Sequence, residues 1–571
     1  MLVVTTRFLR NLYGRSRWRV GLLLLFCSVL FLANNELIEA DIMECRNLVT
    51  AREMVVNHHW LLPTMNGEPR IEKPPLPTWL AAFAYFLSPS GLALPRAISA
   101  LAALLLLYYA YRLARDVLRI PAEVAVVFLA TSVSFWLMAR TATWDIFTHA
   151  FMMGGIYHGA MGMTRSGRSG YRDFFLSGCW MGLSVMSKGP VSLYALFLPF
   201  VISFGVVRRV EVCQKWKGLL LMLAVAAVVG GWWYAYLYGM EQETLQRVSA
   251  KESGNWFNHH VRPWYYYWKF FLESGVWSAL LLTSLLLPLS RKSGIFRSAL
   301  TAKSHPCARG WLMSAVWLLC ILVLLSLLPE KKSRYLFPLL IPAAYCMSCL
   351  YGFWRRLPAG DRMGRAAFRW NVWLLLLVTV VLAGCLCYLF VQMVSEGLPG
   401  WSLVQAMLCL AATCAAGGLL WQAARRWRPR WMLAGVMVLF LGWSCFGLPL
   451  CRPWVNNPEK RSIATAAASA ELLGVPFFHS ADEPLRIELI YAAGREVRPL
   501  ELCDSVALFS ALPCGVLTHR PLETYLTPEV RLRLDIMPLG SFDDNARPRR
   551  SGRYKEDFLY CLTLVRSRTQ E

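Results

Sequence analysis

Long apolar runs without charge are the feature that most limits how this chain can fold. The runs RVGLLLLFCSVLFLA (19–33) and WNVWLLLLVTVVLAGCLCYLFV (370–391) carry no charge beyond the arginine that opens the first. A helix needs about 20 apolar residues to cross a hydrocarbon core about 30 Å thick, and its backbone polar groups must be bonded within the segment. The runs therefore predict transmembrane helices, in agreement with a mean hydropathy of +0.42.

The basic residues lie between these runs in an order that predicts the topology. If the N-terminus is cytoplasmic and the spans alternate, six turns rich in Arg and Lys fall on the cytoplasmic side: 112–119, 164–173, 208–217, 291–309, 355–369 and 424–430. Cytoplasmic loops of membrane proteins carry an excess of these residues. We expect about thirteen spans, at 19–34, 95–113, 121–138, 146–163, 173–187, 190–207, 217–239, 269–289, 310–328, 335–353, 371–393, 402–422 and 431–449.

Charge and cysteine content exclude two other classes. The net charge of +24 is typical of nucleic-acid-binding proteins, but here the positive charge is divided among short loops, so no nucleic acid partner is expected. Most of the 17 cysteines lie within apolar spans, including the single CxxC pair of Cys346 and Cys349, and we predict no metal site from cysteine. The first run resembles a signal peptide without a clear cleavage site, and we expect an uncleaved anchor.

The same topology places five segments on the outer face: 35–94, 139–145, 240–268, 329–334 and the tail after 450. We predict a transmembrane domain over 1–450 and a small soluble α/β domain over 451–571, located in the periplasm of an inner-membrane protein. Within the first loop, the apolar stretch 76–88 is typical of a helix on the membrane surface. In the tail, Cys503, Cys514 and Cys561 allow one disulfide, whose pairing the sequence leaves open.

The outer segments contain cations that the topology rule disfavours. Their retention indicates an anionic ligand, such as a lipid phosphate at the outer membrane surface. Nearby carboxylates would act as a general base on an acceptor hydroxyl or amine. For any single residue, a solvated loop charge or an interfacial anchor is the competing interpretation, and it accounts for much of WYYYW (264–268). The cations are Lys73, Lys331, Lys332 and Arg334, together with Lys188 in the hairpin between the expected spans 173–187 and 190–207.

Taken together and in this order, the outer motifs resemble those of the C-type membrane glycosyltransferases. The similarity is greatest to the bacterial branch that includes the lipid A aminoarabinose transferase and the protein O-mannosyltransferases. It extends over roughly residues 20–340. The matching motifs are MECRNLVTAREM (43–54), WLLP (60–63), NGEPRIEKPPLPTWL (66–80), R-x-x-x-x-D (140–145), SKGP (187–190), the 252–260 loop and KKSRYLFP (331–338).

This resemblance implies a polytopic helical fold and the transfer of a sugar, with inversion, from a polyprenyl-phosphate donor such as undecaprenyl phosphate. The acceptor is outside the cytoplasm and is a lipid, a polysaccharide or a protein. Carried over by motif, Arg46, Lys73 and Tyr335 hold the donor phosphate, and we add the neighbouring Lys332 and Arg334 because of their charge. Further substrate contacts are expected from Glu72, Lys188, Glu252, His259, His260 and Tyr265.

The catalytic carboxylate is the point at which the sequence departs from the family. The first acidic motif is usually Asp-Glu, whereas this chain has Met43 and Glu44. Glu44 is therefore the expected base, with Asp41 as the alternative and Asp145, in the second acidic motif, as an assisting group. Some relatives use a divalent cation, and Glu44 and Asp145 leave that cofactor open.

Two other functional classes compete with a transferase. A transporter or flippase of a lipid-linked anion usually carries ionisable groups within its spans, whereas here His149 and His158 are the main candidates. A purely structural membrane protein would not need basic residues in its outer loops. Near the base, Glu53 is expected to form a helix-surface ion pair with Arg52 or a neighbour.

Overall fold

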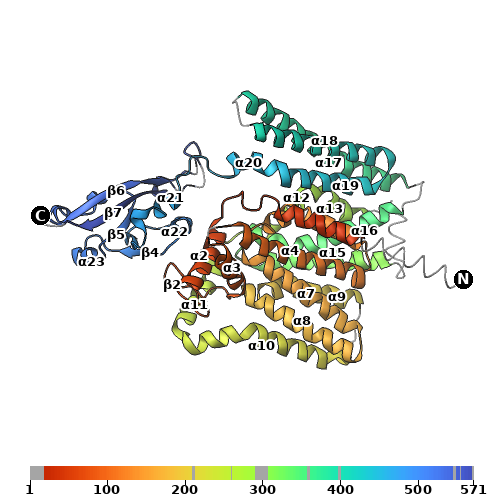
Figure 1. The fold of residues 1–571 in the computed structure, drawn as a ribbon. Helices are drawn as coiled ribbons and strands as arrows, with labels where there is room; N and C mark the ends of the chain where they lie inside the picture. The colour runs from red at the N-terminus through yellow and green to blue at the C-terminus, as the bar shows by residue number, and fades with distance from the viewer. Residues whose placement is uncertain are drawn as a thin grey trace. The chain divides into compact units, whose positions relative to one another are not determined.

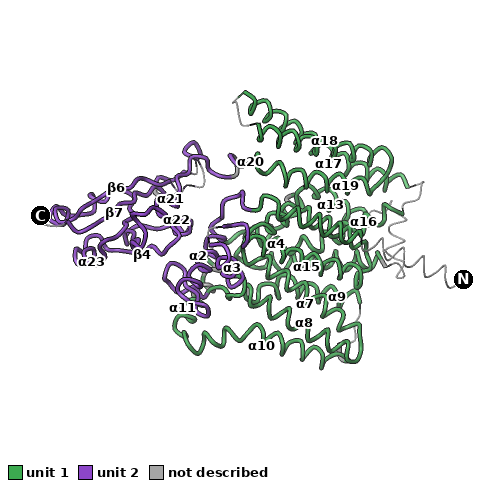
Figure 2. The backbone as a smooth tube through the Cα atoms, viewed as in Figure 1, with its two compact units in different colours: residues 1–35, 72–77, 96–450 green, residues 36–71, 78–95, 451–571 purple. Residues whose placement is uncertain are grey.

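The structure is a computed structural model that describes residues 18–89, 91–208, 212–258, 260–289, 306–356, 361–395, 400–543, 545, 548–552 and 554–568. The chain forms two compact units, shown in green and purple in Figure 2. The first comprises Met1–Asn35, Glu72–Pro77 and Arg96–Leu450, and the second comprises Glu36–Ile71, Thr78–Pro95 and Cys451–Glu571. Most of the first outer loop is thus grouped with the tail, whereas our prediction placed it with the transmembrane domain.

The first unit is a helical bundle (Figure 1). It begins with the helix Trp18–Leu32. The remaining helical elements are α4 (Ala93–Arg112), η1 (Leu113–Leu118), α5 (Ala122–Ala130), α6 (Val133–Met138), α7 (Trp144–Thr164), α8 (Gly167–Lys188), η2 (Leu193–Phe197), α9 (Leu198–Arg208), η3 (Val212–Lys215), α10 (Trp216–Met240), α11 (Gln242–Asn258), η4 (Trp264–Lys269), α12 (Phe270–Glu273), η5 (Gly275–Trp277), α13 (Ser278–Leu286), η6 (Leu287–Leu289), α15 (Pro306–Leu327), η7 (Ser333–Leu339), α16 (Leu340–Arg355), α17 (Arg362–Ser395), α18 (Gly400–Arg426), α19 (Pro429–Gly442), η8 (Trp443–Gly447) and α20 (Leu448–Val455).

By length and composition, seven helices among the described residues can cross a membrane, or eight if the bent pair Trp264–Leu272 and Gly275–Leu289 forms one span. The chain is a multi-pass membrane protein, and the count of about thirteen spans stays a prediction. One predicted span, 121–138, is interrupted between α5 and α6. The hydroxyls of Thr131 and Ser132 donate to the carbonyls of Val127 and Phe128, at 2.6 and 2.8 Å, and such bonds compete with the regular helical ladder.

Small residues allow α7, α8 and α10 to pack closely. A Cβ on Gly155 of α7 would lie 2.8 Å from Cγ of Met181, and one on Gly182 of α8 would lie 2.5 Å from Cβ of Val229. Close backbone approach over small residues is a main source of helix association in membranes, where lipid tails are as apolar as leucine. Because only residues 165 and 166 separate α7 from α8, the start of α7 and the end of α8 lie at the same end of this pair.

The second unit contains the predicted C-terminal α/β domain. Its sheet has the strand order β4-β3-β5-β7-β6. Strands β4, β3 and β5 are parallel to one another, and β7 is antiparallel to both of its neighbours, β5 and β6. The strands are β3 (Phe477–Ser480), β4 (Val497–Leu500), β5 (Cys514–Thr518), β6 (Leu534–Asp543) and β7 (Leu559–Ser567). The helical elements are α21 (Ala464–Ala467), η9 (Ala470–Leu472), α22 (Ile487–Ala493), α23 (Ser505–Ser510), η10 (Leu522–Thr524), α24 (Pro528–Leu532) and η11 (Glu556–Phe558).

The first outer loop adds α2 (Ile42–Val56), the two-stranded hairpin β1 (Thr64–Met65) and β2 (Glu68–Pro69), and α3 (Leu76–Leu87). The apolar stretch 76–88 is thus helical, as predicted. The disulfide that the sequence allowed does not form, because Cys503, Cys514 and Cys561 are all free thiols. Cys514 lies within β5 and is fully buried, where it packs as a small apolar residue.

Candidate active site

A buried ion pair joins the second acidic motif to the SKGP motif in the first unit. Asp145 lies in the first turn of α7, and Lys188 is the last residue of α8. Their side chains form a salt bridge and are only 9% and 7% exposed. Gly189, with φ +75°, ends α8 directly after the lysine, a backbone conformation that glycine adopts without strain. The helix hairpin thus brings together two residues that are 43 positions apart in the sequence.

Three cations surround the ring of Tyr335 at the start of η7. Nζ of Lys188 lies 5.6 Å from the ring centroid, Cζ of Arg334 lies 5.8 Å from it, and Nζ of Lys332 lies 6.0 Å from it. The tyrosine hydroxyl donates to Glu330 at 3.3 Å, and the same carboxylate forms an ion pair with Lys332. Sequence reasoning missed Glu330, because PEKKSR reads as a basic patch in which a single carboxylate carries no separate signal.

Electrostatic interactions extend this cluster to Lys73 of the first outer loop. Lys73 and Arg334 repel the ammonium group of Lys188, and Arg334 also attracts the carboxylate of Asp145. Two atoms, Nε of Arg334 in this cluster and Oε2 of Glu72, the residue before Lys73, are buried without a hydrogen-bond partner in the part of the chain that the structure describes. Buried polar atoms are nearly always bonded, so these two are available to polar groups of a ligand.

We call this group the cation cluster. It consists of Lys73, Asp145, Lys188, Arg334 and Tyr335, with Glu330 and Lys332 at its border. The structure therefore brings together five of the residues predicted for donor or substrate binding together with a predicted acidic residue. Excess positive charge around a tyrosine hydroxyl suits a phosphate ligand, because lysine and arginine bind it through charge-assisted hydrogen bonds.

Lys331 does not belong to the cluster. Its side chain is buried and donates to the carbonyl of Leu328, so it closes the turn after α15. Arg140, which the motif comparison placed beside Asp145, is likewise turned elsewhere. It donates to the carbonyls of Leu30 and Phe31, at 2.9 and 3.3 Å, and to that of Ala33. It thereby satisfies carbonyls at the C-terminal end of the first helix, a typical role for arginine.

The segment that contains the aromatic run 264–268 supports the cation cluster and does not only anchor the chain. Tyr267 is fully buried, and its hydroxyl accepts a hydrogen bond from the backbone of Lys332 at 3.0 Å. The backbone of Val261 pairs with that of Glu330, and the carbonyl of His260 accepts from Lys331. The interpretation of WYYYW as interfacial anchors is therefore wrong for Tyr267, although it remains suitable for the exposed Tyr265.

The side chains of two predicted substrate contacts, His260 and Tyr265, gain no role in the cluster. His260 contributes through its backbone, and its side chain is exposed, as is that of Tyr265. His259 and the side chain of Glu252 lie outside the described residues. Of the two histidines within predicted spans, His158 is hydrogen-bonded to Asp173 at 3.0 Å, and His149 stacks on Phe337 with centroids 5.1 Å apart.

The first acidic motif lies in the second unit, at the start of α2. Asp41 is the N-cap of this helix, and its Oδ1 accepts from the backbone N–H of Glu44 at 2.8 Å. Glu44 is fully buried in the first turn, where the helix dipole favours a negative charge. Arg46 is exposed one half-turn further. Capping accounts for Asp41 without any catalytic role.

Glu53, expected on the helix surface, is buried with only 1% of its surface exposed. Its predicted ion pair with Arg52 is confirmed, at 3.5 Å. The surface location was wrong because the β1–β2 hairpin lies over Glu53, whose carboxylate accepts from Thr64, Asn66 and Gly67. As to metals, no group of three or more His, Cys, Asp or Glu side chains occurs among the described residues. Asp145 is already paired with an ammonium group, and a divalent cation would compete with it.

Three comparisons with known proteins identify what the chain is similar to. Residues 72–234 match the family described as dolichyl-phosphate-mannose-protein mannosyltransferase. The undecaprenyl phosphate-α-4-amino-4-deoxy-L-arabinose arabinosyl transferase of Pseudomonas aeruginosa is 26% identical over 423 residues, covering 70% of each chain. A second such transferase, from Pseudomonas fluorescens, is 27% identical and covers 58% of this chain and 57% of its own.

Among solved structures, ArnT from Cupriavidus metallidurans bound to undecaprenyl phosphate has a TM-score of 0.64 and 17% identity, and covers 96% of this chain and 98% of its own. This likeness establishes the fold. The chain is a multi-pass membrane glycosyltransferase that is similar to those of the C type. Within that class it is similar to the aminoarabinose transferases, as the outer motifs predicted.

Proposed function

We propose that this enzyme transfers a sugar from a polyprenyl-phosphate donor to an acceptor on the outer face of the membrane. The proposal rests on the cation cluster. Lys73 and Arg334 both interact electrostatically with Lys188, and Lys188 and Arg334 both lie near the ring of Tyr335. Asp145 and Glu330 form ion pairs with Lys188 and Lys332, so the four cations of the cluster outnumber its two carboxylates, and an anionic ligand would balance the excess. The relatives' names indicate undecaprenyl phosphate as the carrier and a pentose as the sugar, and a lipid such as lipid A suits the acceptor.

In the proposed mechanism the cation cluster holds the donor phosphate and stabilises the charge that develops as the sugar leaves. Phosphate is a good leaving group, so little acid assistance is needed. The acceptor must lose a proton as it attacks, and one carboxylate suffices for this step. We assign it to Glu44. Asp145 is held by Lys188, which favours its ionised form and makes it a weak proton acceptor, so we assign it to fixing that lysine.

The phosphate assignment predicts the effect of removing single cations. Losing one charge-assisted hydrogen bond costs roughly 1.5–3 kcal/mol. Lys73→Ala should therefore raise the donor concentration needed for half-maximal transfer by about tenfold or more. The effect of Arg46→Ala should be similar. The measurement is transfer from undecaprenyl-phosphate-linked sugar in proteoliposomes, followed by the release of undecaprenyl phosphate.

Lys269→Ala is the matched control, because this lysine lies over the ring of Tyr266, 4.2 Å from its centroid, and not over Tyr335. Its donor requirement should equal that of the wild type. If Lys73→Ala and Arg46→Ala both turn over donor normally, the phosphate assignment is wrong. If the wild-type protein moves donor across the bilayer without releasing undecaprenyl phosphate, the protein is a transporter and the proposed function fails.

The proposed topology has a cytoplasmic N-terminus and the C-terminal domain outside, because six basic turns then lie in the cytoplasm. A reporter that is active only outside the cytoplasm, fused after residue 460, should be active. The same reporter inserted in the turn 355–369 should be inactive. The opposite pair of results would reverse the orientation and place the cation cluster on the cytoplasmic face.

A further inference from the structure

The helix that carries Glu44 is part of the hydrophobic core of the C-terminal domain. Cys45 and Val49 of α2 are buried in one cluster with residues of that domain, among them Phe477 of β3, Leu489 of α22 and Leu562 of β7. These contacts join segments more than 400 residues apart in the sequence. Because Cys45 directly follows Glu44, the side of the helix next to the proposed base is packed against the domain that ends the chain.

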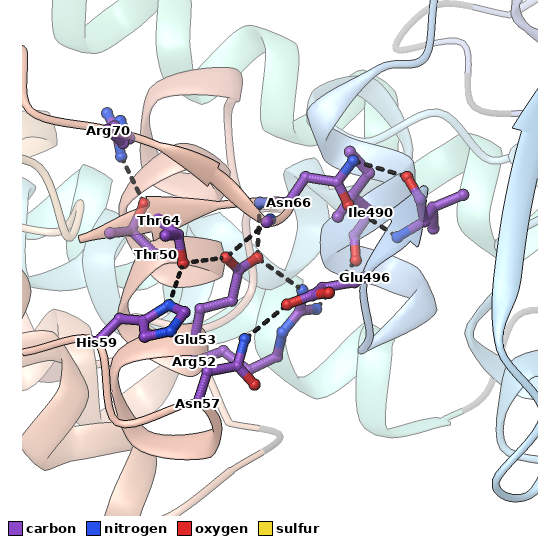
Figure 3. Close-up of polar contacts among 12 residues, drawn as sticks. Thr50, Arg52, Glu53, Asn57, His59, Thr64, Asn66, Arg70, Ile490 and Glu496 are labelled. Atoms are coloured by element: carbon purple, nitrogen blue, oxygen red, sulfur yellow. Dashed lines mark hydrogen bonds and ion pairs between the residues drawn. The ribbon is translucent and has the colours of Figure 1, made fainter. Parts of the chain in front are cut away.

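Polar contacts fix the other end of α2 to the same domain, as Figure 3 shows. Arg52 donates to the carbonyl of Ile490 at 3.2 Å, and Asn57 donates to Glu496 at 2.6 Å. The side-chain amide of Asn66 both donates to the carbonyl of Val497, at 2.7 Å, and accepts from its N–H, at 2.8 Å. Val497 begins β4, the edge strand of the sheet, so Asn66 satisfies backbone groups that an edge leaves open.

Glu53 holds Asn66 in position for this contact. Its carboxylate accepts from the backbone N–H groups of Asn66 and Gly67, at 2.6 and 3.1 Å, and from the hydroxyl of Thr64 at 2.7 Å (Figure 3). Asn66 and Gly67 have φ of +58° and +81°, the left-handed conformations that asparagine and glycine adopt most readily in a tight hairpin. The buried carboxylate therefore shapes the turn that grips β4.

A third set of bonds connects the hairpin back to the turn of α2 that carries the motif. Arg70 donates to the carbonyl of Arg46 at 2.7 Å and to the hydroxyl of Thr50 at 2.9 Å. The hydroxyl of Thr78 donates to Asn47 at 2.8 Å. Helix α2 is thus tied to the C-terminal domain by its apolar side and by the hairpin, and little of it is free to move alone.

We propose that the C-terminal domain positions the catalytic helix, so that α2 and the domain fold and unfold as one cooperative unit. Arg52, Glu53 and Asn66 are then positioning residues for Glu44. This inference rests on the proposed function only for its catalytic part. A cooperative unit is recognised by amides that open together, with one free energy of opening for the whole unit.

The test separates the coupling from the catalysis. Val516 lies in β5 and belongs to the other core cluster of the sheet, which contains no residue of α2. Val516→Ala in the full-length protein leaves a cavity and should speed amide exchange in β5 by about tenfold or more. If the proposal holds, exchange in α2 rises by the same factor. Arg531→Ala, at an exposed site on α24, is the control and should change the exchange rate neither in β5 nor in α2.

The catalytic part is read from transfer in the same proteins. On heating, Val516→Ala should lose sugar transfer at the lower temperature at which its C-terminal domain unfolds. Asn66→Gly, which keeps the left-handed turn but loses both bonds to Val497, should lower kcat about threefold to tenfold with the donor KM unchanged. Wild-type exchange of α2 in Val516→Ala, or transfer that persists after its domain has unfolded, overturns the inference. If the wild-type protein itself transfers no sugar, the proposed function is wrong. The amide-exchange measurement then still tests whether α2 and the C-terminal domain unfold together.

Discussion

Replacing Glu44 by Gln should slow sugar transfer by about 10²- to 10⁴-fold, the usual cost of losing a general base. Glutamine keeps the shape of the side chain and its hydrogen-bonding capacity in the first turn of α2, so donor binding should survive. The measurement is single-turnover transfer in proteoliposomes with saturating donor. Because glutamine has nearly the same shape as glutamate and the Asp41 cap of α2 is unchanged, the loss should appear in the rate and not in folding.

Three variants locate the base by comparison. Asp41→Asn should be close to the wild type in rate, because the amide oxygen still accepts the bond from the backbone of Glu44. Glu68→Gln, at an exposed position of β2, is the neutral control. Glu53→Gln cannot serve as one, because Glu53 shapes the hairpin turn. Wild-type rates in Glu44→Gln with a loss confined to Asp41→Asn would move the base to Asp41.

Removing Lys188 should have the second large effect, on stability as well as on rate. Asp145 and Lys188 are each less than a tenth exposed, and breaking a buried pair by deleting one partner costs roughly 3–5 kcal/mol. Lys188→Ala should therefore unfold at a clearly lower temperature in detergent and lose transfer activity. The cause is the carboxylate of Asp145, which is left charged and buried without its ammonium partner.

The double variant Lys188→Met, Asp145→Leu tells the two roles of the pair apart. Replacing a buried ion pair by apolar residues of similar size is often neutral or stabilising, so the unfolding temperature should recover. Transfer should not recover, because the cation cluster has lost the charge next to Tyr335. A double variant with normal transfer would show that the pair only holds α7 against α8. A Lys188→Ala protein with wild-type unfolding would show that the pair does not contribute to stability.

The sequence predicted the parts of the fold that depend on local composition. Apolar runs of helical length identify helices wherever they occur, and the alternation of apolar and polar segments after 450 correctly predicted an α/β domain. The cations on the expected outer face could be predicted as a group, because each one breaks the charge rule for the side of the membrane on which the predicted topology places it.

Which of these groups contact one another could not be predicted, because that depends on packing between distant segments. Nothing near Asp145 marks Lys188 as its partner, and nothing near Lys331 shows that it turns to the carbonyl of Leu328. The same limit explains the error for Glu53. A charged pair in a helix is normally solvated, but here the β1–β2 hairpin binds Glu53 and the carbonyl of Ile490 in the C-terminal domain binds Arg52.

Mass spectrometry of lipid A, polysaccharide and protein glycans tests sugar transfer most directly, in cells with the wild-type gene, without it, and with the Glu44→Gln gene. The account predicts that one glycan class carries an additional sugar residue only in cells with the wild-type gene. The polyprenyl-phosphate-linked sugar should accumulate in the other two strains. Identical glycans and identical levels of lipid-linked sugar in all three strains would contradict the assignment of this protein as a polyprenyl-phosphate-dependent glycosyltransferase.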